Sequence, residues 1–335
     1  MMASALVALA ASAVSAALLH QWAVRRQVLK KVGMTLVKGT RNLPPVGGIA
    51  LALGSAAGLL HWQLLGGGRW TTELTCVLLA GGLIFTLGLI DDFVRELSPW
   101  QKVVGQAAAW LFLVRGGIII RIVYLPGWAN LLVALLWTLT IVNAFNLLDV
   151  VDGLAIGIAV LATATFFLIT AMTHQTAISW GLAILCGALG GVLLFNFPRA
   201  RLFLGDSGSM LAGLWLAAVA VLISYAPLGR EVALLTPLLV LGLPVYDLAF
   251  VMIVRARQGR SVFRKSRDHF VFRLIQQGCS PVQAAMAMFG LCLAFSLTAL
   301  IVNLASNPIG FLTVGGVVAF TLWWGVRMAR VRMDA

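Results

Sequence analysis

Five aspartates of this sequence are grouped in three short motifs, each beside a long apolar segment. The motifs are Asp91-Asp92, Asn143-x-x-Asn146-x-x-Asp149-x-x-Asp152 and Gly205-Asp206-Ser207-Gly208-Ser209. Only 10% of the 335 residues are charged and 61% are hydrophobic. Ionisable groups beside apolar spans are costly and therefore mark functional positions. Carboxylates grouped in this way predict a site that handles cations or phosphates.

Asp91 and Asp92 end an apolar segment, directly after Gly88-Leu89-Ile90. Two adjacent carboxylates repel each other unless a proton or a cation lies beside them. A solvated helix end is the alternative, but acids at a helix C-terminus interact unfavourably with the helix dipole. We interpret the pair as a metal ligand and a base that acts on a phosphate substrate.

The Asn/Asp motif repeats a polar residue every three positions. In an α-helix each such step rotates the side chain by about 60° backward, so the two ends of the motif oppose each other. The spacing therefore predicts either a helix break near Asn146 or Asp149 or a tightening toward a 3₁₀ form. Gly153 fits a change of backbone course. Helix capping alone accounts for one or two of these residues, not for four.

In the third motif, small residues let backbone amides approach a phosphate at a helix N-terminus. Asp206 is suited to hold a Mg²⁺ that bridges this phosphate. The alternative is that Asp206 or Ser207 only caps the helix.

Lys102 and His269 are the two basic residues that we consider as candidates for this site. Lys102 begins an apolar segment, where it either meets a lipid phosphate or extends its amine to the interface. His269 follows Asp268 inside the basic stretch from Arg255 to Arg273. That stretch either grips a diphosphate or only attracts anionic lipid.

The elements that position these residues are expected to be membrane helices. A mean hydropathy of +0.99 is typical of a polytopic helical membrane protein. A bilayer core of about 30 Å needs about 20 apolar residues per helix. The sequence predicts an all-α fold of eleven spans: 3–24, 46–65, 73–90, 101–117, 128–146, 153–173, 177–195, 208–226, 232–254, 281–303 and 309–326. The β-branched run 118–125 predicts one short extracytoplasmic strand or hairpin.

The distribution of basic residues predicts the orientation. With these spans, 20 of the 24 Lys and Arg residues lie on one side, and the positive-inside rule makes that side cytoplasmic. The N-terminus is then outside, the C-terminus inside and every acidic motif on the cytoplasmic surface. Topology explains the net charge of +13, so we expect a lipid bilayer rather than nucleic acid as partner.

These motifs, in this order, resemble those of the polyprenyl-phosphate N-acetylhexosamine-1-phosphate transferases, glycosyltransferase family 4. Pro44-Pro45-Val46-Gly47-Gly48 and Pro244-x-x-Asp247 resemble two further elements of that family. The likeness runs from about residue 44 to 280, within a single membrane domain 1–335, and eleven spans resemble the branch that initiates surface glycans. The chain departs from the family at 31–41, which holds no acid, and at Val271 and Phe272, where further histidines are common.

The resemblance implies transfer of N-acetylhexosamine 1-phosphate, expected to be GlcNAc 1-phosphate, from a UDP-sugar to undecaprenyl phosphate, with release of UMP. It implies a bacterial inner-membrane enzyme that uses Mg²⁺, or Mn²⁺, and that begins the synthesis of a cell-surface glycan such as an O-antigen, a lipopolysaccharide or the cell wall. A homodimer is left open. The implied catalytic residues are Asp91, Asp92, Asp149 and His269. Asp206 and Asp92 would hold the metal, and Lys102, Asn146, Asp152, Asn196, Phe203 and Asp268 would bind substrates.

Two other functions remain as alternatives. A solute or cation transporter would use the same carboxylates, although transporters usually place such groups near the bilayer midplane rather than at one face. A catalytically impaired relative would explain the departures from the family pattern, but all five motif aspartates are retained.

Overall fold

A computed structural model describes residues 1–28, 30–31, 42–225, 231–261, 267–331 and 333. The acid-free stretch 32–41 and the basic residues Arg264 and Lys265 therefore lie outside the described residues. The expected all-α class is confirmed: the described elements are helices except β1 (Lys30–Lys31) and β2 (Asn42–Leu43), two short antiparallel strands. The chain divides into two compact units, Met1–Ile223 and Ser224–Ala335.

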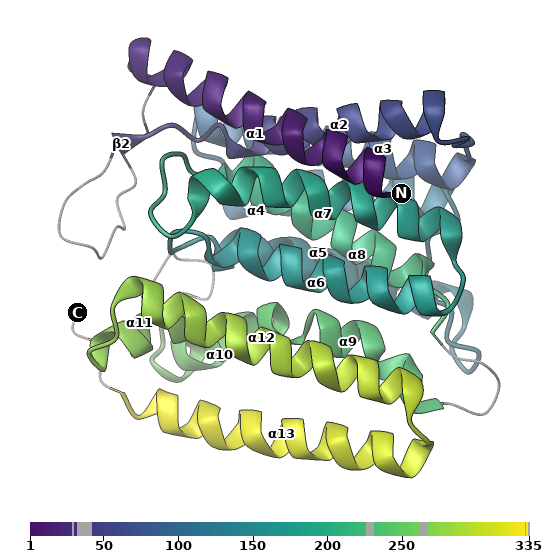
Figure 1. Cartoon of the computed structure of the whole chain (residues 1–335). Helices are drawn as coiled ribbons and strands as arrows, with labels where there is room; N and C mark the ends of the chain where they lie inside the picture. The colour runs from purple at the N-terminus through teal and green to yellow at the C-terminus, as the bar shows by residue number, and fades with distance from the viewer. Residues whose placement is uncertain (29, 32–41, 226–230, 262–266, 332, 334–335) are drawn as a thin grey trace. The chain divides into compact units, whose positions relative to one another are not determined.

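In the described part of the first unit, eight α-helices form a bundle with α8 at its centre (Figure 1). They are α1 (Met2–Arg25), α2 (Gly47–Leu65), α3 (Thr72–Leu89), α4 (Pro99–Arg115), α5 (Gly127–Leu148), α6 (Leu154–Met172), α7 (Thr176–Asn196) and α8 (Gly205–Leu222). Helices α2, α3, α5 and α6 all pack against α8. Small side chains along α8 allow this close surrounding, so the N-terminal turn of α8 is reached from several other helices.

Helix α1 belongs to this bundle because small residues let it approach α2 and α7 closely. Its buried positions include Ser4, Ala8, Ser12 and Ala16. The Ser12 hydroxyl donates a hydrogen bond to the Ala188 carbonyl oxygen at 2.8 Å. A Cβ atom at Gly187 would lie 2.2 Å from the Ala5 carbonyl oxygen. The packing thus requires the absence of a side chain at Gly187.

The second unit places α12 (Pro281–Leu304) alongside α13 (Asn307–Ala329), and α12 also contacts α9 (Thr236–Val240), α10 (Gly242–Arg257) and α11 (Phe270–Gln276) (Figure 1). The expected straight span 232–254 is instead broken. A 3₁₀ turn, η2 (Glu231–Leu235), leads into α9, and the axis bends by 67° before α10. Pro244 has no amide hydrogen to donate to the preceding turn, which favours a break at this position.

The number of membrane spans differs from the expected eleven. Among the described residues, nine helices are long and apolar enough to cross a membrane, or ten if the bent pair counts as one span. The remaining expected span, 101–117, is helix α4 with 17 residues. At about 1.5 Å per residue it is shorter than the apolar core of a bilayer. Eleven spans are therefore not confirmed.

The strand or hairpin expected at 118–125 is absent: residues 118–122 have no regular secondary structure, and a turn follows at Val123 and Tyr124. The Ile118 amide donates to the Leu113 carbonyl oxygen, and the Leu125 amide to that of Ile122. The Asn130 side chain accepts from the Ile122 amide at 3.0 Å. β-branched residues favour a strand only where a second strand can pair with them; here local turns and the Asn130 amide take the backbone hydrogen bonds.

The packing of α1 predicts that substitution by Ala has opposite effects on thermal stability at two glycines of α7. Gly187→Ala should lower the midpoint of thermal unfolding in detergent by several degrees, because the new methyl group collides with the α1 backbone. Gly181→Ala is the matched control: its Cβ would meet nothing within 4 Å, and Ala is the better helix former. Equal midpoints for the two variants would contradict this account of α1.

Candidate active site

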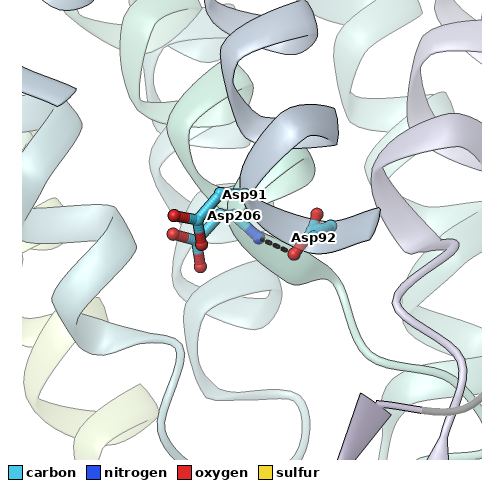
Figure 2. A group of neighbouring side chains, drawn as sticks. All are labelled: Asp91, Asp92 and Asp206. Atoms are coloured by element: carbon cyan, nitrogen blue, oxygen red, sulfur yellow. Dashed lines mark hydrogen bonds between the residues drawn. The ribbon is translucent and has the colours of Figure 1, made fainter. Parts of the chain in front are cut away.

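Three aspartates from the first and third motifs meet at one point of the first unit. Asp91 and Asp92 lie in η1 (Ile90–Val94), a π-helical turn that continues α3, and Asp206 lies in the first turn of α8. One ligand oxygen from each lies within 4.8 Å of the other two. Figure 2 shows Asp91 and Asp206 side by side, with Asp92 reaching the backbone of α8. The first and third motifs therefore converge within this unit.

The π-helical turn explains how adjacent side chains both reach α8. The Arg95 amide donates to the Ile90 carbonyl oxygen at 2.9 Å, five residues back, which widens the last turn. Such turns are rare and occur frequently at functional sites. At Gly88 a Cβ atom would lie 2.2 Å from Ser207 Cα. The two backbones touch there, which brings η1 against the start of α8.

The Asp92 carboxylate caps α8 from outside that helix. It accepts from the Asp206 amide at 3.0 Å, the Ser207 amide at 3.0 Å and the Ser207 hydroxyl at 2.8 Å. The first amides of a helix have no partner within the helix, and a negative charge there is favourable. Gly205 allows the approach, since it has a φ of +75° and a Cβ there would lie 2.5 Å from Asp92 Oδ2. The cap is thus Asp92, not Asp206 or Ser207.

Lys102 places its ammonium group between two of these carboxylates. Its Nζ lies 3.0 Å from Asp91 Oδ1 and also contacts Asp206 Oδ2. The Leu97 amide donates to the same Asp91 oxygen at 2.7 Å, so the start of α4 is fixed against the site. A capping box between Ser98 and Gln101 completes this helix start. Lys102 therefore faces the acidic group, where its positive charge offsets two negative ones.

The Asn/Asp motif breaks the helix as one of the two expected alternatives predicts. Helix α5 ends at Leu148, Asp149 leaves the helical conformation with ψ of 60°, and Gly153 has a φ of +74° before α6 begins. Asn146, one turn earlier, donates its amide to the Ser209 hydroxyl of α8 at 3.1 Å. The break turns Asp149 toward the aspartate group, while Asn146 ties α5 to α8.

Burial, together with the negative charges of Asp206, Asp92 and Asp152, raises the pKa of Asp149 to about 8. A hydrogen bond from the Gly205 amide acts in the opposite sense and lowers that pKa. The perturbed pKa of Asp149 thus reports on the nearby carboxylates, as expected of a group in a functional site.

Asp152 and Phe203 lie in the two loops that follow α5 and α7, and Asn196 is the last residue of α7. Asp152 Oδ2 accepts from the Ala200 amide at 3.0 Å. Asn196 accepts from the Gly153 amide at 2.9 Å and donates to the Leu202 carbonyl oxygen at 2.7 Å. These side chains tie the loops to each other, and their contact with a nucleoside stays a prediction.

Backbone hydrogen bonds from the Pro44–Gly48 element also hold the loop between α7 and α8. The Phe203 amide donates to the Pro44 carbonyl oxygen at 3.0 Å. The Gly47 and Gly48 amides donate to the carbonyl oxygens of Phe203 and Leu204, each at 2.9 Å. This segment therefore fixes the loop that leads into α8.

A second polar cluster, in the second unit, contains the other two predicted residues. His269 Nδ1 lies 2.6 Å from Asp247 Oδ2, and the Phe270 amide donates to Asp247 Oδ1 at 3.0 Å. Three arginines surround the buried Asp268: Arg255, Arg260 and Arg273. The basic stretch thus binds its own aspartate, and His269 is oriented by Asp247.

Sequence reasoning missed the individual roles of Ser207, Gln106 and Asp247. Ser207 donates to Asp92. Gln106 is fully buried and exchanges hydrogen bonds with the Asn143 amide. Two sequence signals could have identified the last two residues: a Gln within an apolar segment for Gln106, and the Pro-x-x-Asp element for Asp247.

The donor set of the aspartate group fits Mg²⁺ or Mn²⁺. It offers carboxylate oxygens only, which these hard cations prefer, and no thiol or imidazole. Three donors already occupy Asp92. Asp206, whose side chain is 20% exposed against 1% for Asp91, would be the main ligand for a cation, with Asp91 beside it.

Comparison with known proteins points in the same direction. The sequence profile of glycosyl transferase family 4 matches residues 74–224, which hold all three aspartate motifs. A decaprenyl-phosphate N-acetylglucosaminephosphotransferase of Mycobacterium tuberculosis is 34% identical over 278 residues, 73% of this chain and 69% of that protein.

Two further relatives extend the match. A probable undecaprenyl-phosphate N-acetylglucosaminyl 1-phosphate transferase of Bacillus subtilis is 27% identical over 79% of this chain and 74% of its own length. A phospho-N-acetylmuramoyl-pentapeptide-transferase of Desulforudis audaxviator is 30% identical over 86% of this chain and 93% of its own length. With the multiple apolar helices and the order of the motifs, these matches confirm the expected family: the chain is a multi-pass membrane protein that belongs to the polyprenyl-phosphate N-acetylhexosamine-1-phosphate transferases of glycosyl transferase family 4.

Proposed function

We propose that this protein transfers N-acetylhexosamine 1-phosphate, specifically GlcNAc 1-phosphate, from a UDP-sugar to undecaprenyl phosphate and releases UMP. The observation that supports this most directly is the group of Asp91, Asp92 and Asp206, in which Lys102 contacts Asp91 and Asp206. Relatives whose names specify a polyprenyl phosphate acceptor and a GlcNAc phosphate product support the same substrates. The charge of the loops supports an active site on the cytoplasmic face of the bacterial inner membrane.

The proposed reaction exchanges one phosphoanhydride bond for another. An oxygen of the lipid phosphate attacks the sugar-bearing β-phosphorus of the donor, and the bond from that phosphorus to the bridging oxygen breaks. UMP leaves with the electron pair of that bond, and the lipid keeps a sugar diphosphate. Phosphoryl transfer depends mainly on positioning and on neutralisation of charge. A bound Mg²⁺ would supply such neutralisation at Asp206.

The structure separates the two members of the Asp91-Asp92 pair. Asp92 holds the start of α8, so we assign it to positioning of Asp206. We assign Asp91, beside Lys102, to deprotonation or orientation of the lipid phosphate. Lys102 would then contact phosphate, and Asp149 would lie next to the metal and the diphosphate. His269, oriented by Asp247, is proposed as a further catalytic residue on the donor side, with Asp268 beside it.

The alternatives remain distinguishable. A transporter would move solute across liposome membranes without forming a lipid product. A catalytically impaired relative would bind substrates without releasing UMP. We favour the transferase because the relatives above are named as transferases. Initiation of a cell-surface glycan would follow from the lipid-linked product.

The first test is transfer by purified protein with Mg²⁺, UDP-GlcNAc and undecaprenyl phosphate, followed by chromatography of the lipid product. Asp206→Asn should lower turnover by about 100-fold or more, because it removes charge at the proposed metal site. Glu96→Gln is the matched control, an exposed acid close to the motif, and should retain turnover within about twofold. Absence of product with every UDP-sugar in a donor panel would contradict the proposal.

A second test follows from the pKa of Asp149. Below about pH 8 this carboxyl group keeps its proton in the metal-free protein. A divalent cation favours the ionised form, so metal binding releases the proton and becomes tighter as the pH rises. Affinity for Mg²⁺ should therefore rise between about pH 6.5 and 8.5, by at most about tenfold per unit for one proton.

The control for this second test is Asp149→Asn, in which the rise should become clearly shallower. Proton release can be followed in weakly buffered solution with an indicator dye while Mg²⁺ is added. A wild-type affinity that does not change with pH, or an unchanged slope in the variant, would show that Asp149 does not sense the cation.

A further inference from the structure

Lys102 occupies the place in the aspartate group that a cation would take. Its Nζ lies 3.0 Å from Asp91 Oδ1 and also contacts Asp206 Oδ2. These two residues also belong to the group whose oxygens lie within 4.8 Å of one another. One ammonium group thus joins both carboxylates at once.

The carboxylates need a proton or a positive charge beside them to stay close together. Asp92 receives hydrogen bonds from the start of α8, which offset its charge. Among the described residues, Lys102 contacts both Asp91 and Asp206 with its positive charge. Like charges at this separation repel strongly where water is scarce. Lys102 therefore helps to hold the group together when no other cation is bound.

The backbone of Lys102 is fixed, but its charged end is not. The capping box of Ser98 and Gln101 and the bond from the Leu97 amide to Asp91 hold the start of α4. The ammonium lies at the end of a flexible four-carbon chain. The Lys102 and Asp206 side chains are 12% and 20% exposed, against 1% for Asp91. Rotation about the side-chain bonds of Lys102 can therefore move the ammonium group while the helix stays in place.

We propose that Lys102 is a resident counter-ion, which fills the cation position in the metal-free protein and moves to a substrate phosphate when a divalent cation enters. The movement of Lys102 to a substrate phosphate rests on the proposed function. Lys102 and the metal then compete for Asp91 and Asp206. A phosphate that attracts Lys102 away from the carboxylates strengthens metal binding, and by linkage the metal strengthens phosphate binding to the same degree.

The direct test is binding of Mn²⁺ alone to the full-length protein in detergent, without substrates. The electron paramagnetic resonance signal of free Mn²⁺ reports the dissociation constant. Lys102→Met removes the charge and keeps a long unbranched side chain. It should lower the dissociation constant by about tenfold or more, because one competitor of the metal is gone. Lys102→Arg, which keeps the charge, should stay near the wild type.

The matched control is Arg115→Met, which removes an exposed basic residue from the other end of the same helix. Its dissociation constant should change by less than about twofold, because long-range attraction is screened by salt. Equal or weaker Mn²⁺ binding by Lys102→Met would overturn the proposal. So would an equal gain in the control, since the effect would then be one of net charge.

A second measurement uses only the wild-type protein and does not depend on the folding of a variant. Reductive methylation of the Lys102 amine, read by mass spectrometry and normalised to the N-terminal amine, should speed up when Mn²⁺ is added. An unchanged or slower rate would contradict release of the ammonium. A parallel transfer assay separates the two proposals: tighter Mn²⁺ binding without any transfer would refute the function alone, and transfer without tighter binding would refute only the counter-ion.

Discussion

The Asp92 cap on α8 is the interaction on which the candidate site depends. A carboxylate from η1 satisfies the first amides of a helix more than a hundred residues later in the chain. The cap draws η1 against α8, and this contact brings Asp91 beside Asp206. Gly88 and Gly205 make the approach possible because neither has a side chain to obstruct it. Loss of this one contact would separate the residues proposed to bind metal and lipid phosphate.

The same closeness creates the electrostatic problem that the site must solve. Several carboxylates lie close to one another, and both burial and this crowding raise the pKa of Asp149. Lys102 and the α8 amides provide the compensating positive charge. A chemistry that consumes and produces phosphate groups suits such a site, because cations balance both the protein and its substrates.

The sequence predicted many residues of this site but few of the hydrogen bonds that connect them. The helix break at Asp149 was one of the two alternatives that the three-residue spacing predicted, and the end of α3 at Asp91-Asp92 followed from the apolar pattern. By contrast, the π-helical turn and the cap from Asp92 depend on a helix far away in the chain. The bend between α9 and α10 was missed because hydropathy averages over Pro244. The strand expected at 118–125 was wrong because β-branched residues need a pairing strand, which the structure lacks there.

The central claim is that the capped aspartate group is a divalent cation site, and anomalous diffraction from crystals soaked in Mn²⁺ tests it most directly. The account predicts a Mn²⁺ peak against the carboxylates of Asp206 and Asp91, with the Lys102 ammonium moved off them and the Asp92 cap unchanged. No peak at this position at saturating Mn²⁺, with Lys102 still seated between Asp91 and Asp206, would contradict the account.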